Sequence, residues 1–145
     1  MKSPFLNHEH ELIRQSIREF SEKEIAPLAY QLDRDEEFSI HLTKRMGEMG
    51  LFGMCIPQEY GGQGLDYMSF IVALEEIARV DSSQAGTLSV HNSLGIGPIY
   101  HHGTKYQKEK YLPDLCKGNQ IWAFALTEPN SGSDSRNSIT KAEQE

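Results

Sequence analysis

The sequence predicts a mainly α-helical domain over residues 1–118, followed at residues 119–145 by the first strand of a second, truncated β-rich domain. Apolar residues that recur every three or four positions, each stripe preceded by capping residues, predict the helices. A continuous apolar run, IWAFAL at residues 121–126, predicts a strand buried on both faces. Because a single strand cannot satisfy its own backbone hydrogen bonds, we expect the chain to end just inside the second domain.

The charge balance excludes some classes of protein. The 145 residues include 21 acidic and 14 basic side chains, for a net charge of −7, which argues against a general nucleic-acid binder. No apolar run approaches the roughly 20 residues that would span a bilayer. The N-terminus has neither the apolar core of a signal peptide nor the Arg-rich pattern of a transit sequence, so we expect a cytoplasmic protein.

The cysteines and histidines do not form a metal-binding pattern. Cys55 and Cys116 lie far apart and outside any CxxC pair, so we expect two small buried apolar side chains, with no disulfide framework and no zinc site. The histidine pairs His8/His10 and His101/His102 lack the four-residue spacing of a helical metal site. We therefore expect no bound metal.

The first half of the helical domain is predicted as two helices and a connector. An amphipathic helix is expected over residues 9–32, with a kink near Pro27, and a solvated loop over residues 33–37. A short helix is expected over residues 40–49, ended by Gly50. The apolar residues 51–57 predict a buried connector.

Three further helices are expected. Asp66 is a suitable N-cap for a central, buried helix that ends near Val80. We expect the Glu75-Glu76 pair of this helix to lie on a solvated face, with a neighbouring salt bridge. A helix from Asp81 to about residue 102 contains many glycines and serines, which indicates that another helix or a ligand packs close to it. A T-x-x-Q capping box predicts a fifth helix over residues 104–118.

The polar segment after the apolar run is the candidate functional element. Residues 127–134, TEPNSGSD, combine hydroxyl groups with a turn whose backbone N–H groups can converge on an anion. The alternative interpretation is an ordinary polar loop.

Several ordered blocks resemble the N-terminal portion of the acyl-CoA dehydrogenase family. They include GEMGLFGMCIPQEYGGQGLD, HNSLGIGPI, HGTKYQKEKYLPDLCKG and WAFALTEPNSGSD, and they extend over residues 9–145. The resemblance implies an N-terminal helical bundle, then a β-barrel domain and a C-terminal helical domain. HNSLGIGPI and FALTEPNSGSD are most similar to the short-chain, butyryl-CoA branch.

The resemblance also implies a chemistry. The family members are flavoenzymes that oxidise acyl-CoA to trans-2-enoyl-CoA with FAD and pass the electrons to an electron-transfer flavoprotein. The family's glutamate base lies beyond residue 145, so we assign no catalytic residue to this chain. We expect a homo-oligomer whose substrate is an acyl-CoA. The alternatives are a non-catalytic helical interaction module derived from the family, or the N-terminal half of a related flavin oxidase.

Site residues follow from the same resemblance, position by position. It implies that Phe124 and Leu126 touch the flavin largely through their backbone and that Thr127 hydrogen-bonds the flavin ring with its hydroxyl or its backbone N–H. Gly132 and Ser133 would meet the FAD pyrophosphate, and Ser133 would also contact the acyl-CoA. Leu94 and the small residues near it would line the acyl-chain cavity. Asn130-Ser131 stands where relatives often carry Gly-Ala, a change that a turn accommodates.

Overall fold

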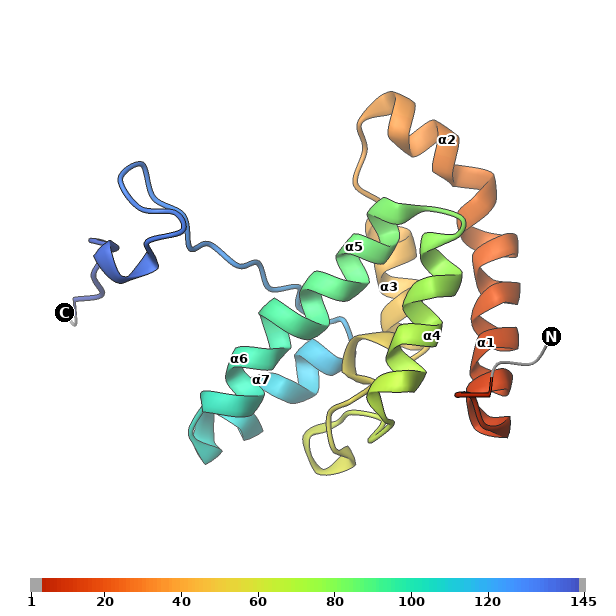
Figure 1. Ribbon diagram of the computed structural model, residues 1–145, viewed down its shortest axis with the longest axis horizontal. Helices are drawn as coiled ribbons and strands as arrows, with labels where there is room; N and C mark the ends of the chain where they lie inside the picture. The colour runs from red at the N-terminus through yellow and green to blue at the C-terminus, as the bar shows by residue number, and fades with distance from the viewer. Residues whose placement is uncertain (1–3, 144–145) are drawn as a thin grey trace.

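The computed structural model describes residues 4–143 and shows a helical bundle with an extended C-terminal segment (Figure 1). Helices α1, α4 and α5 lie side by side, with α3 and α7 behind them (Figure 1). The α-helices of the described residues are α1 (His8–Phe20), α2 (Ala26–Asp35), α3 (Ile40–Glu48), α4 (Tyr67–Ala78), α5 (Ser82–Val90), α6 (Gly97–His102) and α7 (Lys105–Cys116). Short 3₁₀ turns occur at Leu51–Gly53, Gln58–Tyr60 and Ser135–Asn137.

The predicted first helix is confirmed as one continuous helical segment, with an irregularity near Pro27. A π-helical turn, Ser21–Ile25, joins α1 to α2, and the N–H of Ala26 bonds to the carbonyl of Ser21. Proline lacks an N–H and its ring collides with the carbonyl four residues earlier, so the local widening relieves that conflict. The loop expected over residues 33–37 is wrong in part, because α2 continues to Asp35 and the chain turns at Glu36, where φ is +54°.

The predicted caps are present. Asp66 accepts a 2.8 Å hydrogen bond from the N–H of Ser69 and begins α4. The same carboxylate lies 3.0 Å from Nε2 of the buried His10, which belongs to the capping box of α1. Hydrogen bonds from Ser69 first, and then from His10, lower the pKa of Asp66 to about 2. One carboxylate therefore connects the N-termini of α1 and α4.

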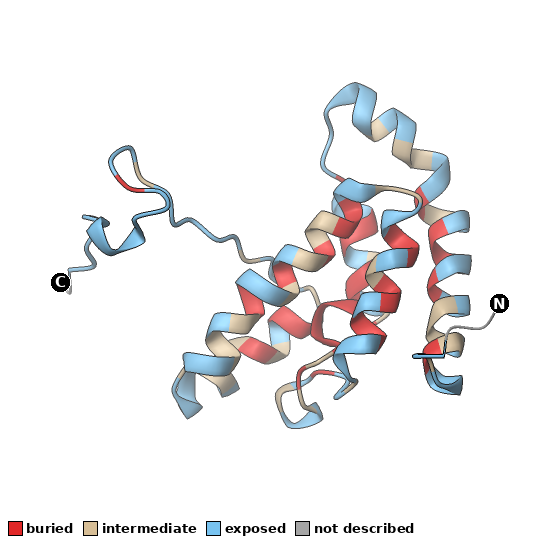
Figure 2. Cartoon of the chain, viewed as in Figure 1, coloured by how far each residue is buried: buried red, intermediate tan, exposed pale blue. Residues whose placement is uncertain are grey.

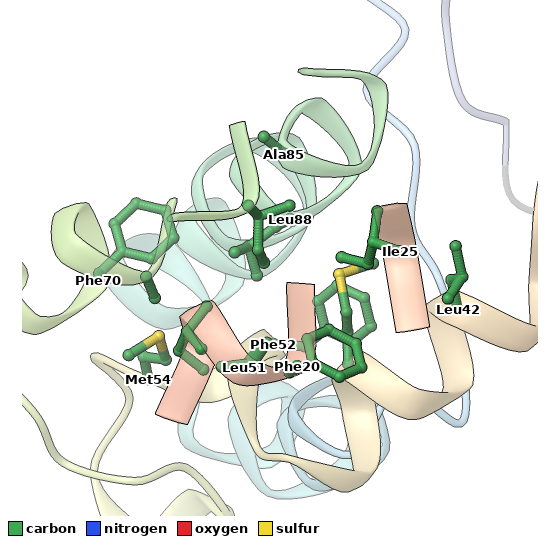
Figure 3. Packing of buried hydrophobic residues seen from close by; sticks show 13 residues of the cluster. Phe20, Ile25, Leu42, Leu51, Phe52, Met54, Phe70, Ala85 and Leu88 are labelled. Atoms are coloured by element: carbon green, nitrogen blue, oxygen red, sulfur yellow. The ribbon is translucent and has the colours of Figure 1, made fainter. Parts of the chain in front are cut away.

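The connector after α3 is buried as predicted and occupies the centre of the molecule. Leu51, Phe52 and Met54 are at most 3% exposed and contact residues from α1, α3, α4 and α5 (Figures 2 and 3). Burial of each such side chain stabilises the fold by about 1.5–3 kcal/mol. A second cluster joins Ile56 to α7 and to the helix that precedes it, through Ile96, Leu112, Leu115 and Cys116. Cys116 is buried, whereas Cys55 is half-buried, and both are free thiols.

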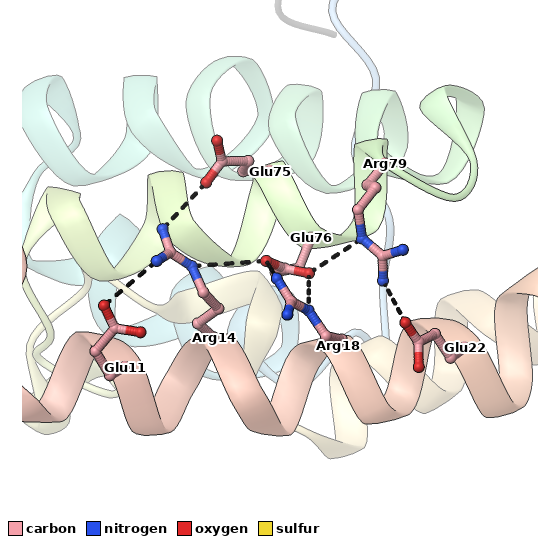
Figure 4. A network of polar contacts seen from close by, with 7 residues as sticks. All are labelled: Glu11, Arg14, Arg18, Glu22, Glu75, Glu76 and Arg79. Carbon is pink, nitrogen blue, oxygen red and sulfur yellow. Dashed lines mark hydrogen bonds and ion pairs between the residues drawn. The ribbon is translucent and has the colours of Figure 1, made fainter. Parts of the chain in front are cut away.

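Glu76 corrects the expectation that the Glu75-Glu76 pair is solvated. Glu75 is exposed, but Glu76 is only 3% exposed and faces α1 (Figure 4). Its carboxylate accepts bidentate hydrogen bonds from Arg18 at 2.7 and 2.9 Å and contacts Arg79 at 3.3 Å. Arg14 lies 3.6 Å away. The side chain is buried because three guanidinium groups replace its water.

The strand predicted at residues 121–126 is wrong for the described residues. Across residues 4–143 no strand forms, apart from an isolated bridge between Glu128 and Ser131. The chain extends away from the helices after Trp122 (Figure 1), and residues 120–127 make no backbone–backbone hydrogen bond. Ile121, Phe124 and Leu126 are 43–48% exposed rather than buried. The physical reason is that residues 4–143 contain no second strand to pair with this segment.

The Glu76 network predicts a stability difference between two adjacent glutamates. We expect Glu76→Gln to lower the free energy of unfolding by about 1.5–3 kcal/mol, because bonds to a charged group are lost. Glu75→Gln, at an exposed position, should change it by less than about 0.5 kcal/mol. Urea denaturation at neutral pH measures both. Equal effects of the two substitutions would contradict the assigned role of Glu76.

The same network predicts an acid dependence. The hydrogen bond from Arg18, together with its charge and that of Arg79, lowers the pKa of Glu76 below its usual 4.5. The folded state therefore binds this proton less tightly than the unfolded state, and the resulting stability is present above pH 4.5 and declines as pH falls through the folded pKa. The difference between wild type and Glu76→Gln should shrink over that range.

The unpaired segment predicts self-association of this polypeptide. Exposed, apolar, extended backbone pairs with any available strand, and the same segment in a second copy is one. We expect sedimentation to show a concentration-dependent dimer that Phe124→Lys disrupts. Tyr106→Lys, at an exposed position on α7, should leave the dimer intact. A wild-type monomer at high micromolar concentration would contradict this prediction.

Candidate functional site

The helix that contains Leu94 presents one face to solvent. Residues 82–102 form a single helical segment, in which a π-helical turn, His91–Ile96, separates α5 from α6. Val90 and Leu94 on this segment are 42% and 40% exposed. A Cβ added at Gly86 would meet nothing within 4 Å. This face is therefore an uncovered surface of small and apolar residues.

Gly95 lies on the opposite, buried side of the π-helical turn. A Cβ at this position would lie 3.3 Å from the carbonyl oxygen of Trp122 and 3.4 Å from Nδ1 of His91. The glycines of this helix predicted that something packs close to it. At Gly95 that neighbour is the backbone of the extended segment that begins near Trp122. The small residues therefore serve two purposes: Gly86 leaves an open face, whereas Gly95 admits Trp122.

Trp122 anchors the start of the extended segment. Its backbone N–H donates to Nδ1 of His91 at 3.4 Å, and its indole packs on Tyr111 with ring centroids 5.2 Å apart. Beyond it the chain leaves the helices (Figure 1). The residues assigned to FAD follow, and Phe124, Leu126, Thr127, Gly132 and Ser133 are all exposed.

The loop after Thr127 folds on itself. Glu128 and Ser131 exchange two backbone hydrogen bonds at 2.8 and 3.1 Å, so Pro129-Asn130 forms the turn. The Glu128 carboxylate accepts from the backbone N–H groups of Ile139 and Thr140 at 2.7 and 2.9 Å. Hydrogen bonds from Thr140 and Ile139 lower the pKa of Glu128. This carboxylate closes the loop, a role that the sequence interpretation did not include.

The loop leaves its predicted ligand-facing groups without partners. Within residues 4–143, the hydroxyl groups of Thr127 and Ser133 have no hydrogen bond, and a Cβ at Gly132 would meet only the Thr127 methyl group, at 3.8 Å. Ser131, in contrast, is buried and donates to the carbonyl of Asp134 at 2.7 Å. The loop is thus internally braced, with Thr127 and Ser133 able to bond a ligand.

Leu94 and the loop belong to different parts of the structure. No hydrogen bond or ring contact within residues 4–143 joins Leu94 to residues 124–133, and the loop stands off the helices (Figure 1). The link between the two is Trp122, which contacts the buried side of the π-helical turn that carries Leu94. The positions of the assigned FAD and acyl residues relative to one another therefore depend on that contact.

A cavity of about 340 Å³ lies between α4 and α6. Its walls include Tyr67, Phe70, Ser93 and Pro98, but not Leu94. Cys55 also lines it, and burial raises the pKa of that thiol, which opposes thiolate chemistry at neutral pH. Sequence reasoning missed this cavity because it forms between residues far apart in the chain. Its mostly apolar walls can hold an apolar group.

The described part of the chain lacks two other classes of site. Residues 4–143 contain no cluster of three or more His, Cys, Asp or Glu side chains suited to a metal ion. None of the described helices has the length and hydropathy needed to cross a bilayer.

The chain is similar to known proteins along most of its length. A family model described as the acyl-CoA dehydrogenase N-terminal domain matches residues 7–119. The short-chain specific acyl-CoA dehydrogenase of Clostridium acetobutylicum is 46% identical over 130 residues, which are 90% of this chain and 34% of that protein. The chain spans about a third of the length of the curated relatives it matches.

Solved structures agree with the sequence matches. Butyryl-CoA dehydrogenase from Megasphaera elsdenii superposes with a TM-score of 0.88 at 35% identity, covering 97% of this chain and 37% of that one. An acyl-CoA dehydrogenase from Bacillus anthracis, complexed with FAD, gives a TM-score of 0.87 at 38% identity, covering 95% of this chain and 24% of that one.

The two glycines of the Leu94 helix predict opposite effects of the same substitution. We expect Gly95→Leu to destabilise the fold by about 1–3 kcal/mol, because the new side chain collides with Trp122. Gly86→Leu should leave stability unchanged or raise it by up to about 0.7 kcal/mol, since leucine is the better helix former and the space is open. Urea denaturation and the emission of Trp122 measure both variants. Similar losses of stability in the two variants would contradict the assigned orientation of the helix.

Proposed function

Because this chain belongs to the acyl-CoA dehydrogenase family, whose N-terminal domain it contains, we propose that it forms part of a flavin-dependent enzyme that oxidises acyl-CoA to trans-2-enoyl-CoA. Its contribution is a wall of the acyl-chain cavity and part of the FAD site. The single observation that carries this proposal is the segment at residues 124–133, in which Phe124 and Leu126 are exposed and the hydroxyl groups of Thr127 and Ser133 are exposed without a partner, next to a loop braced by Glu128.

The residues of this loop fit FAD. Thr127 offers a hydroxyl donor of the kind that a flavin carbonyl or ring nitrogen accepts, and Ser133 offers one to a pyrophosphate oxygen. Gly132 has no side chain and has open space above it, so a pyrophosphate can approach the backbone there. Phe124 and Leu126 provide apolar surface that a flavin ring would cover.

Each part of the chain has a distinct task in the proposed reaction. Bound FAD supplies the hydride acceptor, as in other members of the family. Thr127 orients the flavin ring, while Phe124 and Leu126 exclude water from one side of it. Leu94 and the open face around Gly86 hold the acyl chain, and Ser133 contacts the CoA portion. These interactions position the reactants rather than transfer a proton.

The glutamate of the described loop, Glu128, is not free to act as the base. Both oxygens of Glu128 accept backbone hydrogen bonds, and Glu76 is paired with arginines. The family resemblance implies that the glutamate base, and most of the FAD and CoA contacts, lie outside the third of the relatives that this chain matches. The proposed activity therefore requires the family's other domains.

Substrate and partners follow from the relatives. The similarity to a short-chain specific dehydrogenase and to butyryl-CoA dehydrogenase favours a short acyl chain. We propose electron-transfer flavoprotein as the electron acceptor and a homo-oligomeric assembly, as the family resemblance implies. The exposed segment at residues 121–126 favours the second candidate function, a helical interaction module that pairs with another chain through this segment.

A chimera tests the proposed function. This chain replaces the matching N-terminal third of the Clostridium acetobutylicum dehydrogenase, and FAD content and flavin bleaching by butyryl-CoA are measured. We expect FAD-loaded, active protein. The isolated chain with added FAD is the control and should be inactive, because it lacks the base and loss of a general base alone costs about 10²–10⁴ in rate. A folded chimera without FAD would support the interaction module instead.

Thr127 provides a residue-level test in the same chimera. We expect Thr127→Val to weaken FAD retention, since a flavin acceptor left unpaired in a buried site costs about 1–3 kcal/mol. Thr127→Ser keeps the hydroxyl and should retain FAD. Unchanged FAD affinity and an unchanged flavin spectrum in Thr127→Val would remove Thr127 from the site.

A further inference from the structure

His91 is a fully buried imidazole with both nitrogens engaged. It begins the π-helical turn between α5 and α6 and is 1% exposed. The ring packs edge-on against Phe52 of the central connector, with centroids 4.7 Å apart. Interruptions of this kind in a helix occur frequently at functional sites. Neither the sequence interpretation nor the proposed function assigns this residue a role.

The hydrogen bonds determine which nitrogen carries the proton. Nε2 lies 3.0 Å from the carbonyl oxygen of Leu115 on α7, and a carbonyl can only accept, so Nε2 is protonated. Nδ1 is then an acceptor, and the backbone N–H of Trp122 donates to it at 3.4 Å. Burial lowers the pKa of His91, which keeps the ring neutral and Nδ1 available at neutral pH.

This bond holds the extended segment to the helices together with the packing of Trp122 on Tyr111. Within residues 4–143, it is the only hydrogen bond that residues 120–127 make to the helical bundle. Gly95, one helical turn after His91, leaves the space that the Trp122 carbonyl occupies. The imidazole therefore contacts the segment at a site lined on its other sides by two fully buried residues, Phe52 of the connector and Leu115 of α7.

Trp122 is close in sequence to the residues assigned to FAD. Phe124 follows two residues later and Thr127 five residues later. A fully extended chain advances at most about 3.3–3.6 Å per residue, so Thr127 stays within roughly 18 Å of Trp122. A shift of the anchor point would move these residues with it.

We propose that His91 is a positioning residue, whose Nδ1 fixes the point at which the FAD-facing segment leaves the helical bundle. It orients this segment and touches neither substrate nor cofactor. The anchoring itself depends only on the contacts of this chain, whereas its consequence for FAD rests on the proposed function.

Two amide substitutions separate anchoring from packing in the 145-residue chain. In His91→Asn, the side-chain oxygen takes the place of Nδ1 and can still accept the hydrogen bond from the Trp122 N–H. The asparagine side chain is too short to reach the carbonyl of Leu115. The amide of His91→Gln reaches as far as Nε2 and keeps the bond to Leu115, but it provides no acceptor at Nδ1. A purely structural role predicts that glutamine, which fills more of the space, is the better replacement.

The hydrogen-exchange rate of the Trp122 amide is measured in each variant, with the Ala123 amide as an internal reference. We expect the Trp122 exchange rate in His91→Asn to stay within about threefold of the wild-type rate. In His91→Gln it should be at least about fivefold faster than in wild type, because one hydrogen bond is lost. Far-ultraviolet circular dichroism should be the same in both. Protection retained in His91→Gln, or lost equally in both variants, overturns the proposal.

The wild-type protein provides a test that does not depend on the folding of any variant. Nitrogen-15 spectra of the histidine side chains at neutral pH should show His91 protonated at Nε2 only. In the monomer, at a concentration too low for the segment to pair between copies, the Trp122 amide should exchange about tenfold more slowly than that of Ala123. A proton on Nδ1, or equal exchange of the two amides, overturns the proposal.

The consequence for FAD is measured in the chimera. His91→Gln should lose FAD at least about fivefold faster than His91→Asn, and a difference in the reverse direction contradicts the positioning role. A chimera that binds no FAD even with His91 intact would refute the proposed function. The exchange measurements on the 145-residue chain would still test whether His91 anchors the extended segment.

Discussion

The buried connector at Leu51–Gly53, with Met54, is the constraint on which the rest of the structure depends. It crosses the centre of the bundle, and each helix that surrounds it must leave room for Phe52, which has no exposed surface. Gly53 permits α7 to approach, since a Cβ there would lie 2.6 Å from that of Cys116. The two hydrophobic clusters meet along this connector, so α7 and the departing segment are positioned by the same residues that hold α1, α4 and α5.

Charge provides a second, more specific constraint on one side of the bundle. A buried carboxylate is stable only with partners, and Glu76 finds them on α1 and at the end of α4 (Figure 4). The bonds from Arg18 to Glu76, and from His10 to Asp66, tie the register at two points along the pair. Polar contacts thus determine alignment, and apolar burial supplies most of the stability.

The candidate site lies where the rigid bundle gives way to an extended segment. Packing between helices keeps the open face around Leu94 and Gly86 in place, whereas the loop after Thr127 is held together by its own hydrogen bonds. His91 and Trp122 connect these two parts. Functional groups held by separate structural units need such a junction, because their relative placement is otherwise unspecified. The segment beyond this junction exposes the hydroxyl groups of Thr127 and Ser133 and the apolar side chains of Phe124 and Leu126.

The sequence by itself determined the local features: the caps Asp66 and Thr104, the buried connector, and the family resemblance of its ordered blocks. These depend on a few neighbouring residues and are visible in the pattern. The tertiary structure alone decided that Glu76 is buried, that Gly95 faces Trp122 rather than the open face, and that His91 receives the departing segment. Each of these depends on residues between 27 and 62 positions away. It also decided that residues 121–126 stay unpaired, because a strand is defined by its partner as well as by its own residues.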